Sequence, residues 1–246
     1  MKNKLVISIA AVAAFVAGPA LAADLPPKSP PPPAYKAPPP VAEFNWSGFY
    51  IGVNGGYGWS TQRTYNFTVD NPTGPKINGG FGGGQIGYNW QMNNFVLGAE
   101  ADFEGSGIRG SVLDVNFGDT MQTKVDYFGT VRGRAGLAFS TALVYVTGGF
   151  AYGHVNTSVS GPALIGSPYN LDRISTGYTL GGGFEYAFTP AWSVKGEYQY
   201  VDLGKNDPVN AAGVRFTALA PPTTNVNRTA FNTVRIGLNY RFGGRY

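Results

Sequence analysis

The sequence contains one histidine, His154, and histidine is the side chain that most often moves protons near neutral pH. A catalytic triad would need His154 beside a serine, such as Ser158 or Ser160, and an acid. No nucleophile motif surrounds either serine, and one histidine cannot make a histidine cluster for a metal. We therefore expect no enzyme, no catalytic residue and no metal site, and we interpret His154 as a strand-end residue near the outside water.

A run of glycines, Gly82-Gly-Gly-Gln-Ile-Gly87, formally matches the glycine pattern of dinucleotide-binding loops. That pattern must follow a strand and open a helix, whereas Tyr88 and Trp90 continue an alternating strand here. We therefore expect the glycines to let neighbouring strands approach closely, and we expect no nucleotide or other cofactor.

The third group of candidate residues is a set of charges that share one parity along five alternating segments. In such a segment residues of one parity lie on one face, so these charges should lie together. The members are Glu100, Asp102, Lys124, Asp126, Arg132, Arg134, Glu185, Lys195, Glu197, Arg235 and Arg241.

The segments that would position these charges are strands with two different faces, and residues 233–242 show this best. Val234, Ile236, Leu238, Tyr240 and Phe242 occupy one parity, and polar residues or glycine occupy the other. About ten residues is the length that a tilted strand needs to cross a bilayer. Similar alternation predicts seven more strands, at about 48–60, 81–92, 95–104, 122–138, 142–155, 176–188 and 192–202. Long connections follow the first, third, fifth and seventh strands, and short turns follow the second, fourth and sixth.

Residues 1–22 have the features of a secretory signal peptide. Lys2 and Lys4 precede an apolar segment from Leu5 to Ala17, and Ala20 and Ala22 supply the small residues of a cleavage site. Residues 23–43 are rich in proline, so we expect an extended periplasmic linker that could contact peptidoglycan. Residues 44–246 then form the domain that contains all eight predicted strands.

Composition excludes several classes of protein. Cysteine is absent, so no disulfide or thiolate site can form, and charged residues make up only 13% of the chain. Without Lys2 and Lys4 the 18 basic residues fall to 16 against 14 acidic ones, a balance that gives no reason to expect nucleic acid as a partner.

The two faces of the strands distinguish a membrane barrel from a soluble one. The uncharged face carries Trp and Tyr from nearly every strand, too much bulk for eight strands to enclose. We therefore expect an all-β, eight-stranded antiparallel transmembrane barrel with its aromatics in the lipid and its charges paired inside. Its surroundings would be outer-membrane lipid and lipopolysaccharide.

Four motifs carry a resemblance to a known family. They are Trp46-Ser-Gly-Phe-Tyr-Ile-Gly-Val-Asn-Gly-Gly-Tyr57, Tyr145-Val-Thr-Gly-Gly-Phe-Ala-Tyr152, Gly183-Phe-Glu-Tyr-Ala-Phe188 and Val234-Arg-Ile-Gly-Leu-Asn-Tyr-Arg-Phe242. Across about residues 44–242 the chain resembles small eight-stranded outer-membrane proteins of the surface-antigen and opacity type, distantly related to the OmpA transmembrane domain.

The resemblance implies a bacterial outer-membrane location, assembly by the barrel-assembly machinery and a role in envelope integrity or surface contact. It also implies an assembly signal in a C-terminal aromatic, for which Tyr240, Phe242 and Tyr246 are the candidates. Two alternatives remain open from the residues: a narrow porin-like channel, and a surface adhesin or receptor, for example for haem, that uses the four long loops.

Overall fold

The computed structural model describes residues 44–60, 75–114, 118–162, 167–205, 209–210, 212 and 228–242. The signal peptide predicted at 1–22, the linker predicted at 23–43 and Tyr246 lie outside the described residues and stay predictions. No helix in the described ranges is long and apolar enough to span a membrane.

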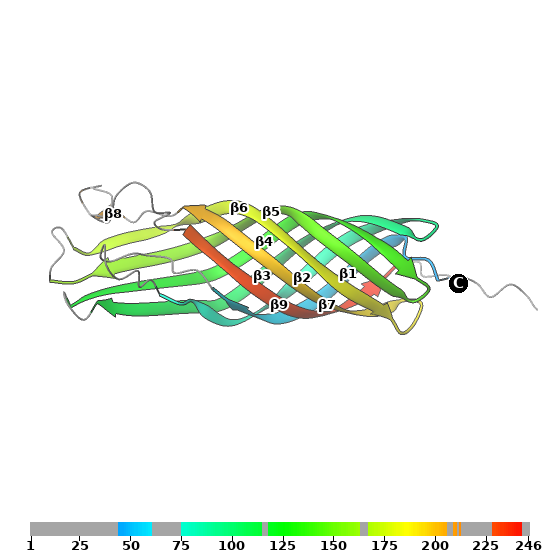
Figure 1. Ribbon diagram of the computed structural model, residues 1–246, viewed down its shortest axis with the longest axis horizontal. Coiled ribbons are helices and arrows are strands. Elements are labelled where there is room, and N and C mark those ends of the chain that lie inside the picture. The colour runs from blue at the N-terminus through cyan, green and yellow to red at the C-terminus, as the bar shows by residue number, and fades with distance from the viewer. Residues whose placement is uncertain are drawn as a thin grey trace, which may run out of the picture. The chain divides into compact units, whose positions relative to one another are not determined.

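Eight long antiparallel strands form a closed ring (Figure 1). Neighbours pair in the order β5-β4-β3-β2-β1-β9-β7-β6, and an additional pairing of β5 with β6 closes the ring. A two-residue strand, β8, pairs with β6 at Tyr169 and Asn170. The strands are β1 Gly48–Trp59, β2 Asn78–Met92, β3 Phe95–Asp114, β4 Asp119–Phe139, β5 Ala142–Ser160, β6 Tyr169–Ala187, β7 Trp192–Lys205, β8 Val209–Asn210 and β9 Arg228–Arg241.

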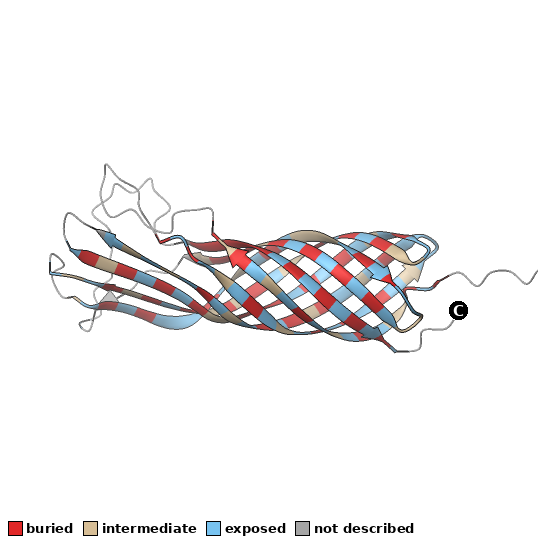
Figure 2. Ribbon diagram, turned by 90° about the horizontal axis from the view of Figure 1, so that it is seen from below, coloured by how far each residue is buried: buried red, intermediate tan, exposed pale blue. Residues whose placement is uncertain are grey.

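The predicted inside-out alternation is present along the strands (Figure 2). In β9 the side chains of Val234, Ile236 and Leu238 are 47%, 66% and 38% exposed. Thr233 and Arg235, which alternate with them, are fully buried. The apolar face therefore points away from the barrel axis, where a bilayer would cover it, and the polar face points inward.

Tight turns join the strands at one end of the barrel. β2 and β3 are joined through Asn93 and Asn94, and β4 and β5 through Ser140 and Thr141, as the sequence predicts. Asn93 and Ser140 both have a φ of 54°, a left-handed conformation that asparagine tolerates better than most residues. The strand ends that are separated by longer stretches of sequence lie at the opposite end, which we call the long-loop end.

Every long strand except β1 runs further at the long-loop end than the sequence predicts, and β3 and β6 gain the most. β3 continues to Asp114 and β5 to Ser160, so most of two predicted long connections is strand. In this extension the polarity of the faces reverses: Val155 and Val159 are buried, and Asn156 and Ser160 are exposed. Apolar residues that face inward and polar residues that face outward are typical of a sheet in water. The sequence prediction assumed apolar residues on the outer face throughout, so it ended these strands where the pattern reverses.

The prediction that Lys124 and Asp126 point into the barrel is wrong. Their side chains are 53% and 31% exposed, and they form an ion pair with each other on the outer face. The register of β4 against β5 shifts between Val125 and Tyr127, which leaves Asp126 as an extra residue. Such a bulge exchanges the two faces of the strand beyond it. Val125, predicted to face lipid, is accordingly fully buried.

An arginine on the lipid face tests this orientation. Ile236→Arg places a charge on an exposed apolar position between β1 and β7, whose partners are Gly55 and Gly196. We expect the free energy of unfolding to fall by about 2–4 kcal/mol, the cost of arginine near the bilayer midplane. Urea unfolding in lipid vesicles measures it, with Asn156→Arg in the extension as the control. Equal stability of the two variants would contradict the assignment of faces.

Candidate functional site

The interior of the barrel holds a network of buried charged and polar side chains. Every one of the eight long strands contributes to it, from Tyr50 on β1 to Arg235 on β9. Its ionisable members are Glu100, Asp102, Glu104, Arg132, Arg134, Glu185, Lys195, Glu197 and Arg235, and each is at most 5% exposed. An isolated charge in such a place would be very costly, so the pairing of these groups determines whether the barrel is stable.

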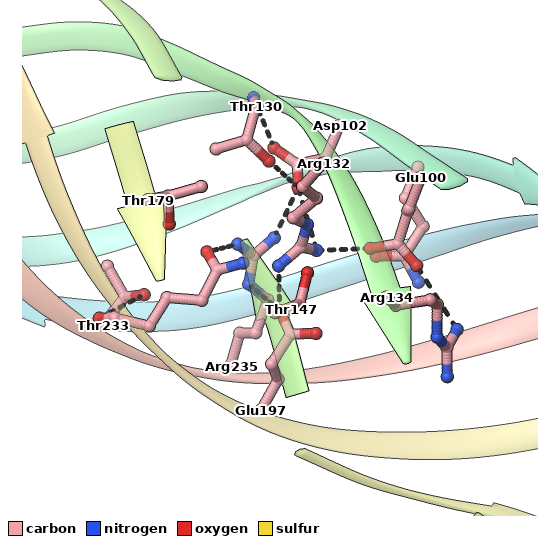
Figure 3. Close-up of polar contacts among 12 residues, drawn as sticks. Glu100, Asp102, Thr130, Arg132, Arg134, Thr147, Thr179, Glu197, Thr233 and Arg235 are labelled. Atoms are coloured by element: carbon pink, nitrogen blue, oxygen red, sulfur yellow. Dashed lines mark hydrogen bonds and ion pairs between the residues drawn. The ribbon is translucent and has the colours of Figure 1, made fainter. Parts of the chain in front are cut away.

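Glu100 on β3 is the most heavily contacted carboxylate of this network. Lys195 Nζ lies 2.8 and 3.0 Å from its two oxygens, and Tyr50 donates its hydroxyl hydrogen at 2.6 Å. Arg132 donates a further hydrogen bond, and Arg134 lies at ion-pair distance, 3.8 Å. Three cations and a phenol therefore converge on one carboxylate from β1, β4 and β7. Figure 3 shows two of these cations, Arg132 and Arg134, beside Glu100.

Two guanidinium groups share a second set of acids. Arg132 contacts Glu197 at 2.7 Å and Asp102 at 3.1 Å. Arg235 lies 3.1 Å from Asp102, 3.2 Å from Glu104 and 3.2 Å from Glu197. Because the two arginines hold Asp102 and Glu197 jointly, they link β3, β4, β7 and β9 across the barrel interior (Figure 3).

A third group of contacts centres on the ion pair between Arg134 and Glu185, at 2.7 Å. The other Glu185 oxygen accepts hydrogen bonds from Ser193 at 2.6 Å and Asn239 at 2.9 Å. The Arg134 guanidinium also lies 4.0 Å from the ring centre of Tyr145, whose hydroxyl donates to Glu197 at 2.7 Å. Aromatic and hydroxyl groups thus complete the coordination of these charges.

Sequence reasoning missed several members of the network. Tyr145 and Leu143 are two residues apart in β5, so they lie on the same, inward face of the strand. This spacing could have identified Tyr145 as an interior residue. Glu104 lies on the same parity as Glu100 and Asp102, so it belonged with the candidates. Tyr50, Gln85, Asn54 and Gln199 are neutral, and the parity of charges alone does not detect them.

Two apolar clusters enclose the ionic network along the barrel axis. Towards the long-loop end the lumen is filled by Ile77, Phe81, Ile108, Val125, Phe128, Ala151, Val155, Val201, Leu203 and Phe231. Phe128 contacts Phe81 and Phe231 with ring centres 5.2 and 5.4 Å apart. At the tight-turn end the second cluster is Phe44, Trp46, Val96, Ala138, Leu143, Tyr145 and Ala187.

Arg241, predicted among the interior charges, is buried at the tight-turn end. Its guanidinium lies 4.3 Å from the ring centre of Phe44 and 5.1 Å from that of Trp46. It donates to the carbonyl oxygens of Asn45 and Pro190 at 3.0 and 3.1 Å. Arg241 therefore holds the segment that enters β1 across this end of the barrel.

The remaining candidates lie apart from the interior network. His154 contacts Asp126 through Nδ1 at 3.1 Å and Asp172 through Nε2 at 2.7 Å, so both ring nitrogens face carboxylates rather than Ser158 or Ser160. The glycines from Gly82 to Gly87 lie within β2, and no helix follows them. Among the described residues no group of three or more acidic, histidine or cysteine side chains is arranged to hold a metal.

The ring of strands, the apolar outer face and the buried polar lumen together define an outer-membrane β-barrel. The model of the outer membrane protein beta-barrel domain matches residues 8–242, so the chain belongs to that family. The 31 kDa outer-membrane immunogenic protein of Brucella melitensis biotype 1 is 38% identical, over 96% of this chain and 99% of its own.

Two further similarities are more distant. The 22 kDa outer membrane protein of Rhizobium leguminosarum bv. viciae is 32% identical over 66% of this chain and 67% of its own. The crystal structure of Neisserial surface protein A matches 80% of this chain and 98% of its own, with 14% identity and a TM-score of 0.43. The family model and the two named relatives are all of outer-membrane proteins, so the protein is located in the outer membrane, as the sequence predicts.

Removing the charge of Glu100 tests the network. Glu100→Gln keeps the shape of the side chain but leaves Lys195 and Arg132 without a shared counter-charge. We expect a loss of about 3–5 kcal/mol in the free energy of unfolding, the usual cost of breaking a buried ion pair. Urea unfolding in lipid vesicles measures this loss.

Asp126→Asn is the matched control, because it removes a carboxylate from the half-exposed outer pair and should cost about 1 kcal/mol or less. A Glu100→Gln barrel as stable as the control would show that the buried network contributes little.

Proposed function

We propose that the protein is a sealed, non-catalytic barrel that supports the outer membrane and presents its long-loop end for surface contact. The observation that carries this proposal is the filling of the lumen in three layers. An apolar cluster, an ionic network and a second apolar cluster follow one another along the axis. An eight-stranded barrel is only wide enough for its own side chains, and here side chains from every long strand occupy it.

The same filling argues against the narrow porin-like channel. An ion that moved along the axis would have to displace Phe128 and its two aromatic neighbours and then separate paired charges such as Arg132 and Glu197. Both steps are costly in a medium of low dielectric constant. Interior charge therefore serves here to hold strands together rather than to select ions.

Single-channel recording tests the sealed lumen. The purified, folded protein in a planar bilayer should give no discrete conductance steps, with a general porin in the same bilayer as the positive control. Phe128→Ala/Phe231→Ala should also stay silent, because the ionic layer still closes the lumen. Discrete steps from the folded wild-type protein would overturn the proposal in favour of a channel.

The extension of β3, β4, β5 and β6 beyond the other strands supports a role in surface contact. These strands have 19–21 residues, against 12 in β1 and 14 in β7 and β9. Short turns normally face the periplasm and long connections the outside, so the extension would stand above the outer leaflet. Adhesion or ligand capture, including that of haem, would use this end.

Epitope insertion tests that orientation. A tag placed after the exposed Pro162, at the end of the extension, should bind antibody on intact cells. A tag between Ser140 and Thr141 should bind only after the outer membrane is permeabilised. The reverse pattern would place the extension in the periplasm and remove the basis for surface contact.

A further inference from the structure

Three basic residues gather on the outer face of the barrel, towards the long-loop end. Arg109 on β3 lies directly opposite Lys124 on β4, and on its other side it lies opposite Asn78 at the start of β2. Ile77 is fully buried, so its neighbours Lys76 and Asn78 point outward, and Lys76 is exposed. Lys76, Arg109 and Lys124 thus occupy adjacent segments on one face, and we call them the basic triad.

The basic triad carries an excess of positive charge. Like charges placed directly opposite on neighbouring strands repel each other, so the pairing of Arg109 with Lys124 needs a compensating anion. Lys124 has one, Asp126, at 2.5 Å, but Asp126 is shared with His154. No ion pair between described residues involves Lys76 or Arg109.

A hollow lies between the two opposed cations. Its volume is about 520 Å³, and Arg109, Gly110, Ser111, Gln122, Thr123 and Lys124 line it. Besides the guanidinium and ammonium groups, the Ser111 hydroxyl and the Gln122 amide can donate hydrogen bonds here. Several donors around a positive hollow suit a phosphate group, which presents several acceptor oxygens.

The basic triad lies just beyond the aromatic boundary of the lipid-facing surface. At that boundary Phe103 and Tyr127 have ring centres 5.4 Å apart, and Tyr127 stacks on His154 with ring centres 5.3 Å apart. Outward-facing aromatic rings of this kind mark the interface between hydrocarbon and headgroups. Lys124 precedes Tyr127 by three residues in β4, one of which is the bulged Asp126, so it lies about 7 Å nearer the long-loop end at the rise of a strand. The hollow is therefore at the depth of lipid headgroups.

We propose that the basic triad binds the phosphate of a phosphorylated glycolipid in the leaflet around the long-loop end of the barrel. Arg109 and Lys124 hold the phosphate oxygens from two sides, Lys76 adds charge beside them, and Ser111 and Gln122 complete the hydrogen bonding. The acyl chains of the same lipid then lie against the apolar surface below Tyr127. The binding is independent of whether the lumen conducts.

Binding of a defined glycolipid to the folded protein tests the proposal. The full chain is placed in phosphatidylcholine nanodiscs that contain either lipid A with its phosphates or enzymatically dephosphorylated lipid A, and bound lipid is counted by native mass spectrometry. The wild-type protein should retain the phosphorylated form about thirtyfold more tightly or better, as expected for two or three basic side chains at a lipid surface. Arg109→Gln/Lys124→Gln should remove this preference.

Two controls separate charge from position, and a third arm identifies the source of the phosphate. Arg109→Lys/Lys124→Arg keeps the charge and should keep the preference, and Arg173→Gln removes an exposed charge from β6 and should also keep it. Excess inorganic phosphate should not displace the lipid. The proposal is overturned if the wild-type protein binds both lipids equally, if the double glutamine variant keeps the preference, if Arg173→Gln loses it, or if free phosphate displaces the lipid.

Discussion

The structure depends on the pairing of charges inside the barrel. Arg132, Arg235 and Lys195 lie where water is excluded, so each would be very costly alone, and each has carboxylate partners on other strands. These partners come together only when the ring is closed, because Glu100 and Asp102 on β3 reach cations on β7 and β9. The buried charges can therefore be paired only when the sheet closes into a ring. This requirement determines which strands must become neighbours.

The apolar character of the outer face follows from the placement of the charges inside the barrel. Once the charges occupy the axis, the alternate side chains of every strand must point outward, and in most of each strand they are apolar. From the headgroup region outward the surroundings change from hydrocarbon to a polar medium, and the strands change accordingly: Val155 and Phe128 turn inward, and Asn156 and Lys124 face out. One continuous sheet thus has two opposite polarity patterns, joined at the aromatic boundary around Tyr127.

Alternation in the sequence was enough to predict the strand count, the closed barrel and the face on which Arg134 and Arg235 lie, because a membrane strand repeats strictly every two residues. It failed where that repeat is interrupted or inverted. The bulge at Asp126 exchanges the faces of β4, and no local residue signals it. The apolar cluster around Phe128 lies inside, where the lipid-facing rule expects polar residues. The partners within the network depend on the stagger of all eight strands, which the sequence of one strand does not contain.

The most direct test of the inside-out arrangement is the accessibility of single positions along β9 to lipid. The chain has no cysteine, so a nitroxide label can be attached at one introduced cysteine at a time, and its collisions with oxygen dissolved in the bilayer can be measured. Labels at Ile236 and Leu238 should collide freely with oxygen, and labels at Thr233 and Asn239 should be shielded from it. The opposite pattern would show that the charges of this strand face the membrane and would contradict the account.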